Sequence, residues 1–582
     1  MKIKIVVFLA MLGFCNTSCN KAQQQPKSIP EITENFKSEL HTDLQNDKVA
    51  GLSMILLNRD STIWTDNFGW ADKDKKLAAT SETKYLIGSV TKVFTAIAVM
   101  QLHEKGIINI DSSFQKYLPE FNMKTRFGKI SDITVRQLLT HHAGLPEDIW
   151  LHKFSKKPPP YTEIIGFANQ QYTAFKPGHI MSYSNLGFTL LGIMVEKVSG
   201  LKYTDYVEQY IFKPLQMNNS GFYTSFEQRK NFAPAYNIDQ VAMDEYPLID
   251  IPAGAIYSTA NDMAKFAKAL INSGSVLLKK ETLEEMYRTQ NMSVALDLDD
   301  RIGLCFNISN KALEAGRIYE HGGATIYHRA QLYLAPDCGL AAVVLSNSEI
   351  GTKNVWKVKE KLIADIARYN GFKADNSKNP WKDVNFANRS DTDMGKFAGY
   401  YATPGITHQL LWKNNMLFTR IMGNEFYLKL NGEHTFNPAK RFLGMTFAKK
   451  DMVFLFEEIE NQKLFIEAKP WGDLNIVSQM VDKPVITKLW KDKFGDYVPV
   501  NTSSDDFEVV KDLKLTELDG FPTLGFKIAG LQKVDLALKI LSNEEAVVLG
   551  LGRAGGETVF LGTENDKNYL IFKGIKFEQK LQ

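Results

Sequence analysis

Hydrophobic and polar positions alternate with two different periods in the first two thirds of the chain. Residues 51–57 and 62–64 are apolar runs of strand length separated by a short polar turn, which predicts a hairpin. Residues 90–103 and 186–198 carry apolar side chains at helical spacing, and Gly200 marks the end of the second helix. Strands and helices are therefore mixed in this part of the chain.

The same part of the chain ends on strands followed by a helix. Residues 329–334 and 340–346 are apolar, and a Pro-Asp turn joins them. Residues 357–368 then form an amphipathic helix. The order of strands, many helices, strands and a last helix predicts an α+β domain over residues 30–370, with an antiparallel sheet built from both ends of the segment.

The last third of the chain has the pattern of β structure. A linker over residues 371–392 is rich in Asn, Lys, Asp and Ser, and beyond it the apolar positions recur with period two. Two similar aromatic turns, at residues 396–400 and 493–497, suggest two successive β units over residues 393–484 and 485–582. Chance aromatic spacing is the alternative explanation of this likeness.

Composition and charge add few constraints. A chain of 582 residues is too long for one hydrophobic core, so two or three domains are expected. Apolar residues make up 44% and charged residues 23%, which is typical of a globular protein. Lys and Arg number 69 against 66 Asp and Glu, a net charge of +3, so nothing indicates a nucleic-acid partner.

The N-terminal residues 1–19 predict a secretory signal. Two lysines precede an apolar run, residues 5–14, that is too short to span a bilayer as a helix. Ser before Cys19 and a polar tail after it resemble a bacterial lipoprotein cleavage site, where the cysteine is lipidated. A plain secretory signal, or cleavage at Cys15, is the alternative. We expect an exported protein in the periplasm or cell envelope, held at the membrane only through this lipid.

The remaining cysteines do not suggest a metal site. Cys305 lies in an apolar run and Cys338 in a turn, so either a disulfide or two separate thiols fits an exported chain. No CxxC pair or Cys/His cluster has the spacing of zinc ligands. We expect no metal and no cofactor.

Ser89 and Lys92 are the first candidates for chemistry. They stand three residues apart at the start of the predicted helix 90–103, so the lysine amine can reach the serine hydroxyl. A serine becomes a nucleophile when a neighbouring base takes its proton, and a lysine can be that base if burial or a nearby cation lowers its pKa. The SxxK spacing alone is a weak signal, because Ser89 could be an ordinary helix cap.

Tyr183, Ser184 and Asn185 form the second candidate group. They follow a Pro-Gly turn and directly precede the predicted helix 186–198, which would hold them rigidly. A phenol near an ammonium can carry a proton if its pKa falls. Asn185 can orient both Lys92 and a substrate carbonyl. The alternative is helix capping by Ser184 beside a core tyrosine.

The third candidate group is His321, Gly322, Gly323 and Ala324, just before the strand at 329–334. Consecutive glycines allow close approach to the backbone, and the amide of Ala324 could form an oxyanion hole with that of Ser89. An ordinary turn with an exposed histidine is the alternative.

Together the three groups, in this order, resemble the serine β-lactamase and DD-peptidase superfamily. Tyr-Ser-Asn is similar to the second motif of class C enzymes. His-Gly-Gly replaces the usual Lys-Thr-Gly and resembles the His-x-Gly form of D-aminopeptidases and some esterases. Further matches over residues 30–370 are residues 133–141, 144–146, 252–254, 257–259 and 262–263. We interpret most of these further matches as structural.

The resemblance implies a β-lactamase/transpeptidase-like fold with a helical subdomain, and an acyl-enzyme mechanism. Ser89 would attack a carbonyl, Lys92 and Tyr183 would relay protons, and the amides of Ser89 and Ala324 would hold the oxyanion. We expect His321 to titrate near neutrality, so recognition of a substrate carboxylate becomes weaker or pH-dependent. Weaker recognition of a carboxylate favours amides of D-residues and esters as substrates.

Other functions remain open at this point. A DD-carboxypeptidase or β-lactamase is the first alternative, and a non-catalytic protein that binds peptidoglycan fragments or peptides is the second. The substrate would be a small molecule or a peptide. The C-terminal β region resembles the lipocalin-like barrels of some family members, which can shape or cover the active site, whereas a stabilising or oligomerising module is its simplest interpretation.

Overall fold

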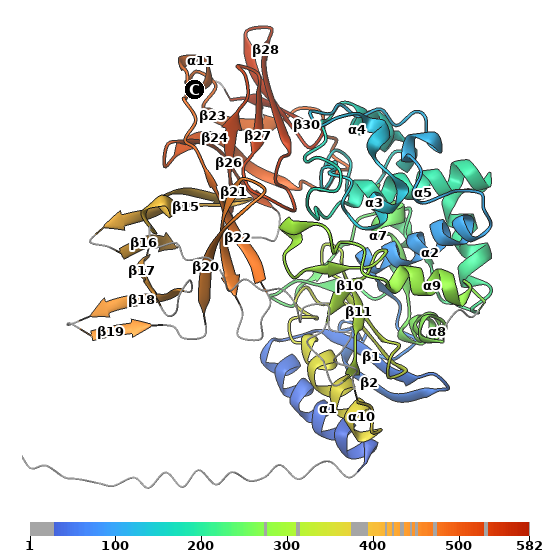
Figure 1. Ribbon diagram of the computed structural model, residues 1–582. Helices are drawn as coiled ribbons and strands as arrows, with labels where there is room; N and C mark the ends of the chain where they lie inside the picture. The colour runs from blue at the N-terminus through green and yellow to red at the C-terminus, as the bar shows by residue number, and fades with distance from the viewer. Residues whose placement is uncertain are drawn as a thin grey trace, which may run out of the picture.

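The computed structural model describes residues 28–272, 276–309, 315–373, 394–413, 416–421, 424–430, 436–442, 445–448, 452–468, 474–528 and 533–580. The predicted signal segment with Cys19, and most of the predicted linker, lie outside these residues. The described chain forms an α+β part followed by two β-barrels (Figure 1). The fold class predicted from the sequence is confirmed.

An antiparallel sheet of eight strands, in the order β3-β2-β1-β13-β12-β11-β10-β9, forms the centre of the α+β part. The predicted hairpin is β1 with β2, and β1 pairs with β13, so both ends of the segment meet in one sheet. The strands are β1 (Gly51–Asn58), β2 (Thr62–Asp72), β3 (Leu77–Ala78), β9 (Arg301–Ile302), β10 (Asn307–Ser309), β11 (Ile318–Ala324), β12 (Arg329–Ala335) and β13 (Leu340–Ser346).

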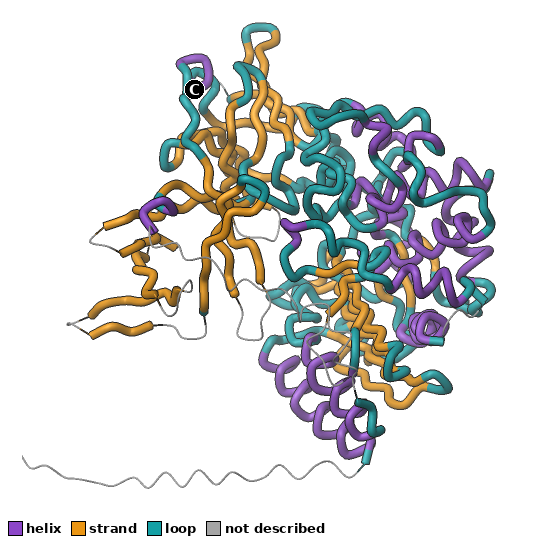
Figure 2. Tube along the Cα trace, viewed as in Figure 1, coloured by secondary structure: helices purple, strands orange, loops and turns teal. Residues whose placement is uncertain are grey.

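Helices cover the sheet and form a separate subdomain beside it (Figure 2). They are α1 (Ile29–Asn46), α2 (Thr91–Glu104), α3 (Val135–Leu139), α4 (Ile164–Asn169), α5 (Asn185–Ser199), α6 (Tyr203–Val207), α7 (Ile251–Gly254), α8 (Ala260–Ile271), α9 (Lys280–Tyr287) and α10 (Ala364–Tyr369). A π-type turn, Val358–Ile363, precedes α10. Within the described ranges, no helix is long and apolar enough to cross a bilayer.

Strand β1 shows how the sheet separates two cores. Leu52, Met54 and Leu56 are buried in one apolar cluster with α1 and α10. Ile55 and Leu57 point the other way and are buried in the cluster that contains α2, α5 and α8. Successive side chains of a strand face opposite sides of a sheet, so an almost wholly apolar β1 indicates a strand covered on both faces.

The C-terminal part consists of two antiparallel barrels. In the first, β17 pairs with β18 and thereby joins the ends of the row β17-β16-β15-β14-β22-β21-β20-β18, with β19 beside β18. Its strands are β14 (Gly399–Thr403), β15 (Ile406–Lys413), β16 (Met416–Ile421), β17 (Asn424–Leu430), β18 (Phe436–Phe442), β19 (Met445–Ala448), β20 (Val453–Ile459), β21 (Gln462–Ala468) and β22 (Leu474–Val481).

The second barrel is closed by eight strands, β23 to β30. They are β23 (Gly495–Pro499), β24 (Val510–Leu518), β25 (Phe521–Ile528), β26 (Lys533–Ile540), β27 (Glu545–Val548), β28 (Thr558–Glu564), β29 (Lys567–Phe572) and β30 (Ile575–Gln579). The resemblance of this region to lipocalins stays a prediction.

The second barrel packs directly against the helical subdomain. Trp150, in the loop after α3, is buried and meets the rings of Phe526 and Phe572 edge-on, 5.6 and 5.5 Å away between centroids. Its amide donates to the carbonyl of Lys573, 2.7 Å away. The side chain thus enters the core of the barrel, which fixes the barrel relative to the loop from residue 147 to 155.

Candidate active site

Ser89 lies in a short 3-10 helix, Gly88–Val90, that leads into α2 and touches strand β11. Gly88 has a φ of +49°, and a Cβ there would lie 2.6 Å from the amide nitrogen of Ala324. A Cβ on Gly323 would lie 2.0 Å from the carbonyl oxygen of Ile87. Both contacts require glycine, so the two glycines bring the backbone of β11 against the turn that carries Ser89.

The hydroxyl of Ser89 is not used to cap a helix. The residues at the N-cap positions of the two helical segments are Ile87 and Val90, and neither position has a side-chain cap. The helix-cap alternative for Ser89 is therefore wrong. The side chain is half-buried and remains available to a ligand.

Lys92 is fully buried and its amine has three close oxygen neighbours. Nζ lies 3.1 Å from Ser89 Oγ, 2.6 Å from Asn185 Oδ1 and 2.8 Å from the carbonyl oxygen of Ala253. A neutral amine has two N–H groups and one lone pair. Because Asn185 Oδ1 and the Ala253 carbonyl can only accept, they use the two N–H groups and leave the lone pair for the hydroxyl of Ser89.

Burial also favours the neutral amine. It lowers the pKa of Lys92 to about 7, although the carboxylates of Asp148 and Asp250 act in the opposite direction. An amine with a pKa near neutrality is partly deprotonated at physiological pH and can accept a proton from Ser89. Geometry and charge together make Lys92 able to act as the base that the sequence pattern predicted.

Tyr183 lies close to both Ser89 and Lys92. Its ring centroid is 5.0 Å from Lys92 Nζ, and its hydroxyl hydrogen-bonds Ser89. Burial raises the pKa of Tyr183 above its usual value, and neither the Ser89 hydrogen bond nor the nearby Arg553 overcomes this effect. The phenol is therefore protonated in the free site, where it can donate a proton but cannot serve as the first base.

His321 differs from the sequence prediction. The ring is buried, and Nδ1 donates to the carbonyl of Gly322, 2.7 Å away. Burial and the positive charge of Lys92 lower the pKa of His321 to about 4. The expectation that His321 titrates near neutrality is wrong, because the imidazole is already neutral there.

Asn185 is oriented by a network that the sequence analysis missed. Its Nδ2 donates to both carboxylate oxygens of Asp148, at 3.0 and 3.1 Å. Asp148 also pairs with the buried ammonium of Lys153, which lies 3.2 Å from Asp250. Since Asp148 can only accept, it fixes the amide with Oδ1 towards Lys92. Asp148 lies two residues after the 144–146 match, which is the only sequence signal for it.

Replacement of Asp148 by Asn tests this positioning role. The variant can present its own NH2 to Asn185 and lets the Asn185 amide turn, so we expect turnover to fall by up to about 10²-fold. Because the carboxylate of Asp148 raises the pKa of Lys92, its loss should also move the acidic limb of the kcat/KM profile to lower pH. A pH profile separates this effect from simple destabilisation, which would leave the limb in place.

Arg553 is the second residue that sequence reasoning missed. It lies between β27 and β28 of the second barrel, and its guanidinium carbon is 5.0 Å from the centroid of the Tyr183 ring. Glu147 Oε1 lies 2.5 Å from Arg553 Nη2, yet 61% of the Arg553 side chain is exposed. Lys573 and Arg553 keep the pKa of Glu147 below its usual value despite burial. The only sequence signal was the glycine-rich run around it, residues 550–556.

Further hydrogen bonds connect the loop between β27 and β28 to the site. Ser182 Oγ donates to the carbonyl of Gly552 at 3.2 Å, and the amide of Glu147 donates to Glu557 at 2.8 Å. The amide of Asn185 in turn donates to the carbonyl of Glu147. The second barrel therefore contributes a cation, Arg553, beside Tyr183, and its loop hydrogen-bonds the neighbouring Ser182 and the amide of Glu147.

The other histidines and cysteines near the site have structural surroundings. His141 Nδ1 accepts from the amide of Ser184, 3.1 Å away, and its ring lies 4.3 Å from that of Tyr183. Cys305 and Cys338 are separate free thiols, so the disulfide alternative is wrong. Among the residues with described positions, no group of three or more His, Cys, Asp or Glu could hold a metal ion.

Comparisons with known proteins match this architecture. A sequence model of the beta-lactamase family matches residues 36–364. Protein flp of Staphylococcus aureus (strain MW2) is 29% identical over 258 residues, 44% of this chain and 50% of that protein. Beta-lactamase-like protein 4 of Dictyostelium discoideum is 33% identical over 241 residues, 37% of this chain and 42% of that protein. The chain thus spans about half the length of the curated relatives it matches.

Solved structures resemble the chain over more of its length. The octameric penicillin-binding protein homologue from Pyrococcus abyssi has a TM-score of 0.51 and 24% identity, over 77% of this chain and 99% of that one. SurE has a TM-score of 0.54 and 19% identity, over 78% of this chain and all of that one (100%). These likenesses concern the fold. Because the family match covers more than half of the chain, the protein belongs to the beta-lactamase family, whose members are generally serine hydrolases.

Proposed function

We propose that this protein hydrolyses an amide or ester, with Ser89 as nucleophile, and that the acyl group comes from a D-amino-acid peptide, a D-aminoacyl amide or a related ester. The observation that carries the proposal is the position of Lys92. Its amine lies 3.1 Å from Ser89 Oγ, and two fixed acceptors use its N–H groups. This arrangement directs the lone pair of the neutral amine at the serine hydroxyl.

In the first half of the reaction, Ser89 Oγ attacks the substrate carbonyl carbon while Lys92 takes the hydroxyl proton. The amides of Ser89 and Ala324 stabilise the negative charge that develops on the carbonyl oxygen. The tetrahedral centre then collapses and breaks the bond to the leaving amine or alcohol. Tyr183 supplies the proton to that leaving group and regains one from the Lys92 ammonium.

In the second half, a water molecule attacks the acyl ester of Ser89. The neutral Lys92 accepts a proton from the water, with Tyr183 as relay, and the ester bond to Ser89 Oγ breaks. The acid leaves, and the Lys92 ammonium returns its proton to Ser89 Oγ, which restores the serine hydroxyl and the neutral amine. No step needs a cofactor, because every proton passes between the three side chains, the substrate and water.

The neutral His321 supports amides of D-residues and esters as substrates. Where relatives carry a lysine in the third motif, this chain has an imidazole with a pKa of about 4, which gives no permanent cation for a carboxylate. SurE, one of the structural neighbours, has been solved with D-Leu. A D-residue at the acyl or leaving side is therefore our first candidate.

Arg553 favours a second candidate, the carboxypeptidase or β-lactamase activity. Its exposed guanidinium stands beside Tyr183 and can bind a substrate carboxylate on that side of the site. Arg553→Gln should then raise KM about tenfold or more for substrates with a carboxylate and leave kcat and neutral esters almost unchanged. Equal effects on both substrate types would contradict this role.

A turnover screen decides between the candidates. The screen measures hydrolysis of esters, D-aminoacyl amides, peptides ending in D-residues and cephalosporins. It uses the unmodified protein, Arg553→Gln and, as a control, Arg317→Gln at a surface arginine directly before β11. We expect D-aminoacyl amides or esters to be hydrolysed fastest. Efficient turnover of cephalosporins with inert D-aminoacyl amides would reverse the order of the two candidates, and binding without any turnover would favour the non-catalytic alternative.

We also propose export and lipidation at Cys19, which rest on the sequence pattern alone. A fatty-acid analogue supplied to cells should label the full chain and fail to label Cys19→Ser. Labelling of both would contradict the proposed anchor, and secretion of an unlabelled protein would favour the plain signal.

A further inference from the structure

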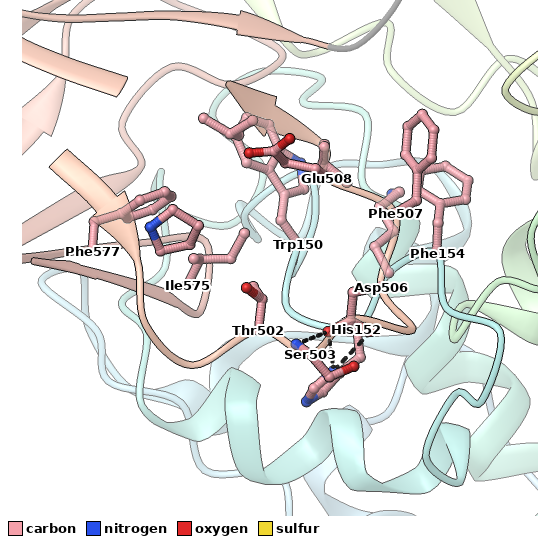
Figure 3. A pocket seen from close by; sticks show the side chains of 14 residues that line it. Trp150, His152, Phe154, Thr502, Ser503, Asp506, Phe507, Glu508, Ile575 and Phe577 are labelled. Carbon is pink, nitrogen blue, oxygen red and sulfur yellow. Dashed lines mark hydrogen bonds and ion pairs between the residues drawn. The ribbon is translucent and has the colours of Figure 1, made fainter. Parts of the chain in front are cut away.

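A cavity of about 190 Å³ lies at the junction of the second barrel and the helical subdomain. Its wall on one side is the segment from Trp150 to Phe154, and on the other the chain before β24 and the start of β30. Figure 3 shows Trp150, Ile575 and Phe577 around one end of the space, with His152, Ser503 and Asp506 gathered at the other. The cavity is separate from the Ser89 site, although its lining residue Lys153 is paired with Asp148 of the network around Asn185.

The walls of the cavity are largely aromatic and aliphatic. Trp150, Ile575, Phe577 and Val510 are buried. Phe154 and Phe507 are half-buried, and their rings meet edge-on with centroids 6.2 Å apart. Such walls favour an apolar group, and the faces of aromatic rings attract a cation.

The charged groups of the lining differ in how fully they are paired. Lys153 binds two carboxylates outside the cavity, Asp148 and Asp250, and Asp506 accepts from the ring of His152 and the amide of Ser503. Glu508 has only a loose partner. Its carboxylate is 3.6 Å from the Lys511 ammonium, with both side chains more than half exposed, at 55% and 53%. Solvent weakens such a pair, so Glu508 can bind another cation.

From this combination we infer that the cavity is a second binding site, which takes a small apolar amine. The apolar body lies among Trp150, Phe154 and Phe577, and the ammonium faces Glu508. The size fits, because an apolar cavity of about 150 Å³ accommodates benzene, so 190 Å³ accommodates a phenyl ring with a short aminoalkyl chain. A carboxylate at the same place meets Glu508 and Asp506 and is repelled. This inference does not depend on the proposed hydrolase activity.

The site has a physical connection to the active site through its own wall. Trp150, Lys153 and Phe154 line the cavity, and Lys153 binds Asp148, which orients Asn185. The occupant therefore contacts the same short segment that supports the amide beside Lys92.

Phenethylamine and phenylacetate, which share the ring and differ in charge, test the inference by titration calorimetry on the full chain. We expect phenethylamine to bind saturably at one site and phenylacetate not to bind. Glu508→Gln should weaken phenethylamine binding about two- to fivefold, whereas the matched control Glu517→Gln, an exposed carboxylate on β24, should not change it. Val510→Trp, which fills the cavity, should abolish binding.

The fold of each variant is checked by thermal melting. If Val510→Trp fails to fold, Thr502→Trp at the exposed rim of the cavity takes its place. Absence of saturable phenethylamine binding by the unmodified protein overturns the inference. Undiminished binding by the folded cavity-filling variant overturns it as well, because the amine then binds elsewhere.

Discussion

Replacing Ser89 by Ala is expected to reduce turnover by about 10⁴-fold or more, the largest effect of any single change considered for this chain. The hydroxyl oxygen is the atom that would form the acyl ester, and among the residues with described positions no other hydroxyl is hydrogen-bonded to Lys92 Nζ. Covalent labelling by a fluorophosphonate should disappear with turnover. The measurement is the rate constant for hydrolysis of the best ester or amide, together with the mass of the labelled protein.

Stability should change little in Ser89→Ala, which separates loss of chemistry from loss of fold. The hydroxyl caps no helix, and Lys92 keeps Asn185 and the Ala253 carbonyl as partners. Ser220→Ala serves as the matched control, since Ser220 is also half-buried and hydrogen-bonded but lies near Asp262. Turnover and labelling retained by Ser89→Ala would show that another residue is the nucleophile.

The sheet and the main helices could be predicted because their local pattern and their packing agree. Residues 51–57 are apolar on both faces because α1 and α10 cover one face of β1 and α2 and α8 the other. Gly200 ends α5 with a φ of +73°, a conformation in which glycine has no steric cost. These features are encoded by neighbours along the chain and need no knowledge of distant contacts.

The contribution of the barrel could not be predicted in this way. Arg553 and Tyr183 are 370 positions apart, and their proximity depends on how the second barrel packs on Trp150. No period or motif in the sequence describes a contact between domains. The run of residues 550–556 is rich in glycine, but the direction in which this loop points follows only from the packing.

The wrong prediction that His321 titrates near neutrality has a related origin. The residue type alone predicted titration near neutrality, but its pKa depends on burial and on Lys92, which β11 approaches through Gly88 and Gly323. Asp148 is a similar case, because its pairing with Lys153 and Asn185 comes from the fold of the loop. Residue types predicted which chemistry is present, and the environment determined the protonation states.

Lys92→Arg should show whether the neutral amine is the base. Arginine keeps the positive charge but does not release its proton at any pH that the protein survives. We expect turnover to fall by about 10² to 10⁴-fold, the usual contribution of a general base. Lys92→Met, which removes both charge and base with a side chain of similar length, should lose at least as much. Lys265→Met, at an exposed lysine of α8, is the control.

The pH dependence of kcat/KM gives the sharper test, because it reports ionisations of the free enzyme. The pKa of Lys92 is lowered by burial to about 7, so below that pH the amine is protonated and cannot accept the proton of Ser89. The rate should therefore fall tenfold per pH unit on the acidic side and become constant above pH 7. In Lys92→Arg this limb should be absent from the residual rate. An acidic limb near pH 7 that persists in Lys92→Arg would assign the base to another group. That group could not be His321 or Tyr183, because burial lowers the pKa of His321 to about 4 and raises the pKa of Tyr183.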